Sequence, residues 1–210
     1  VKSGAKLDAI STWSRALSPT EISALYNAGN GTQYPHTSQT LATPFNKLGI
    51  DNGTLMNGTT IVTGKVGSAF QFNGSSYVQL PDKSLNLTES FSISAWFKTA
   101  GTIVNAENYI LCNKSVNSWY TNPNGFGLTQ YGNSIIFDIL NNTNTYTELI
   151  IGYTFTTNTW YHITATKQLN GNMKVYLNGT LIGTKVTTVN PTFLTTYHKP
   201  SIGAMTIQGT

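Results

Sequence analysis

Beyond residue 35, apolar and polar residues alternate with a period of two. In FSISAWFK, residues 91–98, every second residue from Phe91 to Phe97 falls on one face of an extended strand. Trp96 falls on the opposite face, and we expect a second layer of the fold to bury it. Similar short runs are AFQFN, SYVQL, FGLTQY, SIIFDIL, ELIIGY, WYHITAT, MKVYLN and TLIGTKV. Many short strands of this kind predict a β-sandwich or a barrel.

Asn-Gly pairs separate several of these runs. The clearest example is KVYLNGTLIG, residues 174–183, where two apolar runs flank Asn178 and Gly179. Both residue types adopt positive φ at low cost, as a type I′ turn requires. The sequence therefore predicts a two-residue β-hairpin turn at this position.

The segment WSRALSPTEISALYNAGNG, residues 13–31, has the pattern of a helix with its own start and stop signals. Ser18 is suited to the N-cap, Pro19 to the first helical position, and Glu21 completes a capping box. Gly29 is suited to end the helix. An apolar stripe follows the start, and its residues are Ile22, Leu25 and Tyr26. Because so short a helix is marginally stable alone, we expect the stripe to pack on the sandwich.

Composition narrows the class of protein. Only 10% of the residues are charged, and the net charge of +4 comes from twelve basic residues that form no run. A nucleic-acid interface needs clustered basic residues, so we predict no nucleic-acid partner. No apolar run reaches the length of a membrane span, so we predict no membrane insertion. We expect residues 1–210 to form one domain, in a virion or at an extracellular or cell surface.

Three strings carry a family resemblance, and they are GKVGSAFQFNGSSYVQLPDKSLNLTESFSISAWFKT, NTWYHITATKQLNGNMKVYLNGTLIGT and PSIGA. In this order they resemble the laminin G-like jelly roll of the concanavalin A-like lectin and glucanase superfamily, over residues 48–204. The resemblance implies an all-β fold, a two-sheet antiparallel jelly-roll sandwich with one short helix near the N-terminus.

In that family a closing strand and a short helix follow the SIGA-like strand. Here the matching segment, LDAISTWSRALSPTEISALYN, stands at residues 7–27, before the domain that it should finish. Residues 1–35 are therefore either permuted to the N-terminus or derived from a preceding repeat. An unpaired strand edge invites aggregation, so we expect self-closure, with residues 7–13 pairing near residues 200–207. Donation of this strand to a neighbouring subunit is the alternative.

The glucanase branch of the superfamily implies paired catalytic carboxylates, which retaining glycosidases hold about 5 Å apart. The acidic residues are Asp8, Glu21, Asp51, Asp82, Glu89, Glu107, Asp138 and Glu148, and none lies within four positions of another. Only Asp138 falls deep within a predicted strand, and a partner could reach it only from another strand. His36, His162 and His198 have no metal-ligand spacing, and Cys112 stands alone in an apolar run. We predict that the chain is not an enzyme.

The resemblance also implies a calcium site near the rim of the sandwich. The matching acidic residues are Asp8 in the closing strand and Asp51 in the IDNGT loop, while the family's Asp-Gly hairpin position is here Asn178-Gly179. Calcium prefers several oxygen ligands that usually include carboxylates, so this departure weakens the site. We predict no required cofactor, and name Asp8 and Asp51 as the ligands if calcium binds.

The segment from Asn113 to Asn133 combines aromatic and amide side chains, and we interpret it as a long inter-strand loop. Sugars are bound by aromatic platforms surrounded by hydrogen-bonding groups. The predicted ligand-binding residues are Trp119, Tyr120, Asn122, Tyr131 and Asn133. The alternative is that Trp119 covers one end of the core.

These observations predict a non-enzymatic recognition or adhesion module that binds glycans or cell-surface polymers, in a virion-associated or secreted protein. The alternative is a structural capsid, tail or fibre module whose partners are neighbouring protein subunits. A glycoside hydrolase is the third reading, and it would require two carboxylates that face each other across a groove.

Overall fold

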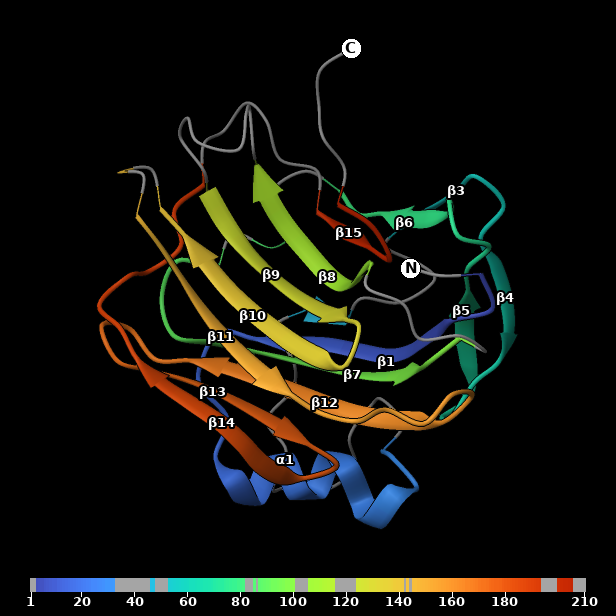
Figure 1. Cartoon of the computed structure of the whole chain (residues 1–210), viewed down its shortest axis with the longest axis horizontal. Coiled ribbons are helices and arrows are strands. Elements are labelled where there is room, and N and C mark those ends of the chain that lie inside the picture. Colours follow the sequence, from blue (N-terminus) through green and yellow to red (C-terminus); the bar gives the residue numbers. More distant parts are fainter. Residues whose placement is uncertain are drawn as a thin grey trace.

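The computed structural model describes residues 3–32, 46–47, 53–81, 85, 87–100, 106–115, 124–141, 143, 145–193 and 200–205. Two antiparallel sheets and one α-helix form this part of the chain (Figure 1). Sheet A contains, in spatial order, β14 (Thr180–Val186), β13 (Asn172–Leu177), β12 (Trp160–Lys167), β7 (Phe91–Lys98), β1 (Lys6–Trp13), β5 (Ser68–Gln71) and β4 (Thr60–Thr63), with β2 (Asn46–Lys47) paired to β1. Sheet B contains β11 (Tyr146–Gly152), β10 (Ser134–Leu140), β9 (Asn124–Tyr131), β8 (Glu107–Ser115), β15 (Ser201–Ile202), β6 (Tyr77–Gln79) and β3 (Thr54–Met56). The predicted all-β sandwich is confirmed.

The core lies between the facing surfaces of the two sheets. Phe91 of β7 packs on Phe126 of β9, with ring centroids 4.9 Å apart, and on Phe137 of β10 at 6.1 Å. All three side chains are completely buried. Period-two alternation explains the packing, because it points every second side chain of each strand toward the other sheet.

Strand β1 lies inside sheet A, between β7 and β5, and its pairing partners belong to the same chain. Leu7 pairs with both Phe70 of β5 and Phe97 of β7. The predicted pairing with residues near 200–207 is wrong, because β15 lies in sheet B, between β6 and β8. The register of β1 shifts between Asp8 and Ser11, so both Leu7 and Ile10 reach the core, and the sequence pattern could not say which strands lie beside β1. That residues 1–210 form one domain stays a prediction.

Helix α1 (Pro19–Tyr26) covers the outer face of sheet A (Figure 1). Its predicted start is confirmed, because the Ser18 hydroxyl and the Glu21 side chain form the capping box. Its end differs from the prediction, since Asn27 takes the left-handed conformation and begins the short 3₁₀ turn η1 (Asn27–Gly29). The buried residues under the helix are Trp13, Leu17, Ile22, Leu25 and Tyr176. In the described residues, no helix is long and apolar enough to cross a membrane.

The ring of Tyr26 stacks on Trp96 of β7, with centroids 5.8 Å apart. Trp96 is only 3% exposed, so its predicted burial by a second layer is confirmed. The predicted turn is also confirmed, since Asn178 and Gly179 have φ values of 50° and 79° between β13 and β14. Gly179 lies against the Tyr26 ring, where a Cβ atom would come 3.2 Å from Cδ1. The turn and the helix end therefore pack against each other.

Replacing Gly179 with alanine should lower the free energy of unfolding by about 1–2 kcal/mol, because a side chain at positive φ is strained and the Tyr26 ring must also move. Urea unfolding would measure the change. The matched control is Gly152→Ala, since a Cβ there meets nothing within 4 Å. Equal stability of the two variants would contradict the described packing.

Candidate ligand-binding pocket

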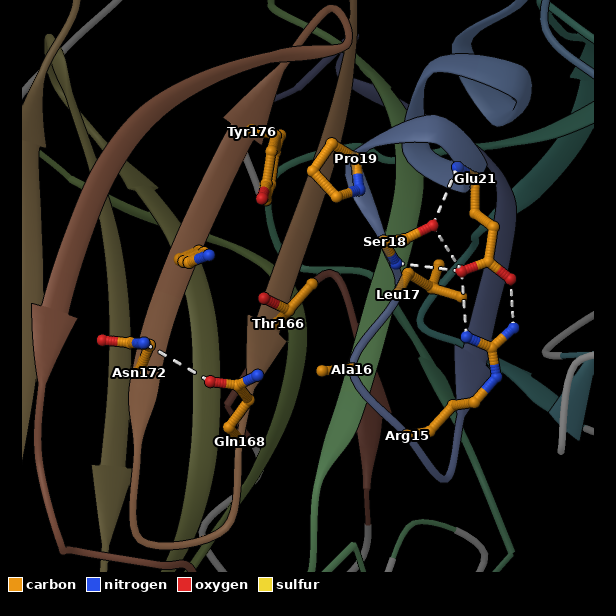
Figure 2. A pocket seen from close by; sticks show the side chains of 11 residues that line it. Arg15, Ala16, Leu17, Ser18, Pro19, Glu21, Thr166, Gln168, Asn172 and Tyr176 are labelled. Carbon is orange, nitrogen blue, oxygen red and sulfur yellow. Dashed lines mark hydrogen bonds and ion pairs between the residues drawn. The ribbon is translucent and has the colours of Figure 1, made fainter.

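A cavity of about 280 Å³ lies where the connection from β1 to α1 passes over the outer face of β12 and β13 (Figure 2). Its residues come from the connection, from the first turn of α1 and from the two strands. They are Arg15, Ala16, Leu17, Ser18, Pro19, Glu21, Thr166, Gln168, Asn172, Lys174 and Tyr176. We name this cavity the α1 pocket.

The floor of the α1 pocket follows from the period of the strands. Thr166 of β12 pairs directly with Lys174 of β13, so both side chains point outward from the core. Residues two positions away share that face, which adds Gln168, Asn172 and Tyr176. This spacing was present in the sequence, but the alternation alone does not show that the connection to α1 passes above it.

Ser92 of β7 holds the connection to α1 above the sheet. Its hydroxyl oxygen accepts a hydrogen bond from the Leu17 amide at 2.8 Å, and its hydroxyl group donates one to the Arg15 carbonyl, also at 2.8 Å. The Ser92 side chain is completely buried, so both bonds are protected from water. They fix the height of the pocket wall above β12 and β13.

The wall itself is an ion pair joined to the helix cap. Arg15 Nη1 donates to Glu21 Oε2 at 2.9 Å, and Nη2 donates to Glu21 Oε1 (Figure 2). The same Oε2 accepts the Ser18 amide at 2.9 Å. The Arg15 guanidinium lowers the pKa of Glu21 to about 2. Glu21 is therefore ionised at neutral pH, and the charge of Arg15 is balanced.

The floor of the α1 pocket, on β12 and β13, keeps hydrogen-bonding groups that are available to a ligand. In the described part of the chain, Lys174 forms no ion pair and is partly exposed, whereas Thr166 and Tyr176 are each only 3% exposed. Asn172 Nδ2 contacts Gln168 Oε1 at a long 3.4 Å, which leaves the other atoms of both amides available. Two amides and an ammonium thus line one cavity, beside the buried Thr166 and Tyr176.

Of the residues that the sequence predicted to bind ligand, the structure describes Tyr131 and Asn133. Residues 124–131 of the segment interpreted as one loop form strand β9, which corrects that interpretation. Tyr131 is 40% exposed at the end of this strand, and Asn133 is exposed in the turn to β10. Trp119, Tyr120 and Asn122 lie outside the described residues.

Asp8, predicted as a calcium ligand, is only 3% exposed, and its Oδ2 accepts the Val66 amide at 2.7 Å. Burial raises the pKa of Asp8, while backbone hydrogen bonds from Val66, Ala9 and Lys65 lower it. The carboxylate thus anchors the turn between β4 and β5. Asp51 lies outside the described residues, and the described part contains no group of three metal-binding side chains. The calcium site stays a prediction.

Ser94 and His162 form a contact that resembles part of a hydrolase site. Ser94 Oγ and His162 Nε2 are 2.8 Å apart, and Thr164 Oγ1 donates to Ser94 Oγ at 3.2 Å. Both members are 2% exposed, because Trp96 and Tyr26 pack over them. No carboxylate orients the ring, since His162 Nδ1 has no hydrogen-bond partner. A substrate could not reach the hydroxyl, so the contact is structural.

Asp138 and Glu148 stand opposite each other on β10 and β11, so a second carboxylate does reach Asp138 from another strand. Asp138 is buried and forms an ion pair with Lys114 of β8 across Gly127, whose missing Cβ would lie 2.6 Å from Asp138 Oδ1. Burial raises the pKa of Asp138, and Lys114 opposes this effect. A glycosidase needs two carboxylates that face a sugar, whereas Asp138 faces a lysine.

The family model described as the concanavalin A-like lectin/glucanases superfamily matches residues 72–209, more than half of the chain. The chain belongs to this superfamily. Botulinum neurotoxin type C of Clostridium botulinum C phage is 28% identical over 104 residues, which cover 47% of this chain and 8% of the toxin. The chain thus spans a small part of that relative.

Solved members of similar fold include the binding domain of Paraclostridial Mosquitocidal Protein 1, with a TM-score of 0.54 at 20% identity, covering 74% of this chain and 40% of that one. The receptor-binding domain of botulinum neurotoxin D has a TM-score of 0.53 at 19% identity, with 79% and 42% covered. The binding domain of botulinum neurotoxin DC in complex with SialylT has a TM-score of 0.51 at 22% identity, with 72% and 38% covered. These likenesses establish the jelly-roll fold of the superfamily member.

His162→Gln should flatten the pH dependence of stability between pH 7 and 5. Burial lowers the pKa of His162 from 6.5 to about 3, so in this range the unfolded chain binds a proton that the folded chain does not. The wild type should therefore lose about 2 kcal/mol as the pH falls from 7 to 5, relative to the variant. Gln can keep the contact with Ser94. Urea unfolding at several pH values measures the difference, and parallel curves would show that His162 titrates normally.

Proposed function

We propose that this superfamily member is a non-enzymatic recognition module that binds glycans in the α1 pocket. The observation that carries the proposal is the set of partly or fully exposed polar side chains of Gln168, Asn172 and Lys174, which line one cavity. Sugar hydroxyls donate and accept hydrogen bonds, and their apolar ring faces pack on aromatic side chains. The lining of the pocket provides hydrogen-bonding groups through the amides of Gln168 and Asn172 and the Lys174 ammonium.

The rigidity of the pocket supports binding rather than a purely structural role. Its walls are the capped first turn of α1 and two paired strands, and the hydrogen bonds of Ser92 lock the connection between them. A preformed site loses little conformational entropy when a ligand binds. The binding domains of clostridial toxins share the fold, which supports a role at an extracellular surface.

A structural module would need a broad apolar surface. Among the most exposed apolar side chains of the described part are Tyr146 and Ile150 of β11. Glu148 lies between them on the same face of the strand, which breaks the apolar strip with a charge. The α1 pocket is therefore the better-supported interaction site. Catalysis has weaker support, because the Ser94–His162 contact is covered and Asp138 is paired with Lys114.

A glycan array probed with the purified chain tests the proposal. The double variant Gln168→Ala/Asn172→Ala should weaken binding about tenfold or more, because each side chain would lose hydrogen bonds to the sugar. Both residues lie on the surface, so the fold should be retained.

Two control variants compare this pocket with the site that the sequence predicted. Tyr131→Ala/Asn133→Ala and Trp119→Ala should leave the binding unchanged. If the Trp119 variant alone abolished binding, the ligand would lie at that residue instead. Absence of binding to every glycan would overturn the proposed function and favour engagement of other protein subunits.

A further inference from the structure

The charges that line the α1 pocket are not balanced. Its charged residues are Arg15, Glu21 and Lys174. The Glu21 carboxylate accepts two hydrogen bonds from Arg15 and one from the Ser18 amide at the cap of α1. Lys174 forms no ion pair in the described part of the chain. The pocket therefore has a net charge of one positive unit, and Lys174 carries it.

The position of Lys174 favours an anion inside the pocket. It is half-buried on β13, and the neighbouring strand places Thr166 directly beside it. Thr166 is only 3% exposed, so Lys174 is the group of this pair that can meet a ligand. An ammonium can donate to an anionic group, and charge-assisted hydrogen bonds are the stronger kind.

We propose that the α1 pocket selects sugars that carry one acidic group, and that Lys174 binds this group. This inference rests on the proposed glycan-binding function. The Gln168 and Asn172 amides then contact the rest of the sugar. A single acidic group is specified because only one cation in the pocket is unpaired. A second acidic group would face the Glu21 carboxylate, which is ionised at neutral pH.

The first test compares three ligands of equal size by isothermal titration calorimetry. They are a methyl glucuronide, the neutral methyl glucoside and a glucoside with one sulfate. The wild type should bind the glucuronide about tenfold more tightly than the neutral sugar. The preference should shrink as salt rises from about 50 to 500 mM, because salt screens the ammonium. Tighter binding of the sulfated sugar would assign the pocket to sulfate esters instead of carboxylates.

The second test removes the charge without shortening the side chain much. Lys174→Gln should reduce glucuronide affinity about tenfold and leave the neutral sugar unchanged, whereas Lys174→Arg should retain the preference. The matched control is Lys98→Gln, which makes the same change in net charge on the same face of sheet A, at the opposite end of β7.

The outcomes separate this inference from the function on which it rests. Equal binding of neutral and acidic sugars, or an unchanged preference in Lys174→Gln, would overturn the charge selection and leave glycan binding intact. If Lys98→Gln lowered glucuronide affinity as much as Lys174→Gln, the preference would come from the net charge of the chain and not from the pocket. If no sugar of either class bound, the proposed function would fail together with the inference.

Discussion

The structure depends on how the outer face of sheet A is covered. Period-two alternation gives that face the serines of β7 and the histidine and two threonines of β12, which are not residues of an ordinary apolar core. Packing α1 over them removes them from water, and this is favourable only if their polar groups find partners. Ser92 bonds to the chain leading into α1, and Ser94 bonds to His162. The aromatic layer of Tyr26 and Trp96 then supplies the apolar contact.

The same covering explains why a pocket exists beside the helix. Helix α1 is only eight residues long and shields the end of sheet A that is close to the β13–β14 turn. Thr166, Lys174 and Asn172 continue the outward-facing rows beyond its first turn, where the chain above them is the connection held by Ser92. The polar character that the sheet needs under the helix thus becomes hydrogen-bonding capacity at its edge. One pattern in the sequence therefore serves both stability and recognition.

Local signals in the sequence predicted local structure well. The capping box at Ser18 and Glu21 and the turn at Asn178-Gly179 each depend on a few neighbouring residues, and both are present. The partners of β1 were not predictable in this way, because alternation fixes the face of a strand and leaves its neighbours open. The α1 pocket escaped prediction for the same reason, since it joins residues near position 15 to residues near position 170. The aromatic and amide residues of 113–133 instead predicted a binding loop there, and part of that segment is strand β9.

Charge pairing explains why recognition would depend on so few groups. Arg15 is neutralised by Glu21 at the rim of the pocket, and Lys114 is neutralised by Asp138 on sheet B. Removing one partner of the buried Lys114–Asp138 pair would leave an isolated charge at a high cost, so this pair is a fixed part of the scaffold. The Arg15–Glu21 pair is partly exposed, and it is held because Glu21 also caps α1. Gly127 shows the constraint directly, because any side chain there would displace the Lys114–Asp138 pair. Lys174, like most of the described lysines, forms no ion pair. Its position in the lining of a preformed pocket is what distinguishes it and points to an anion.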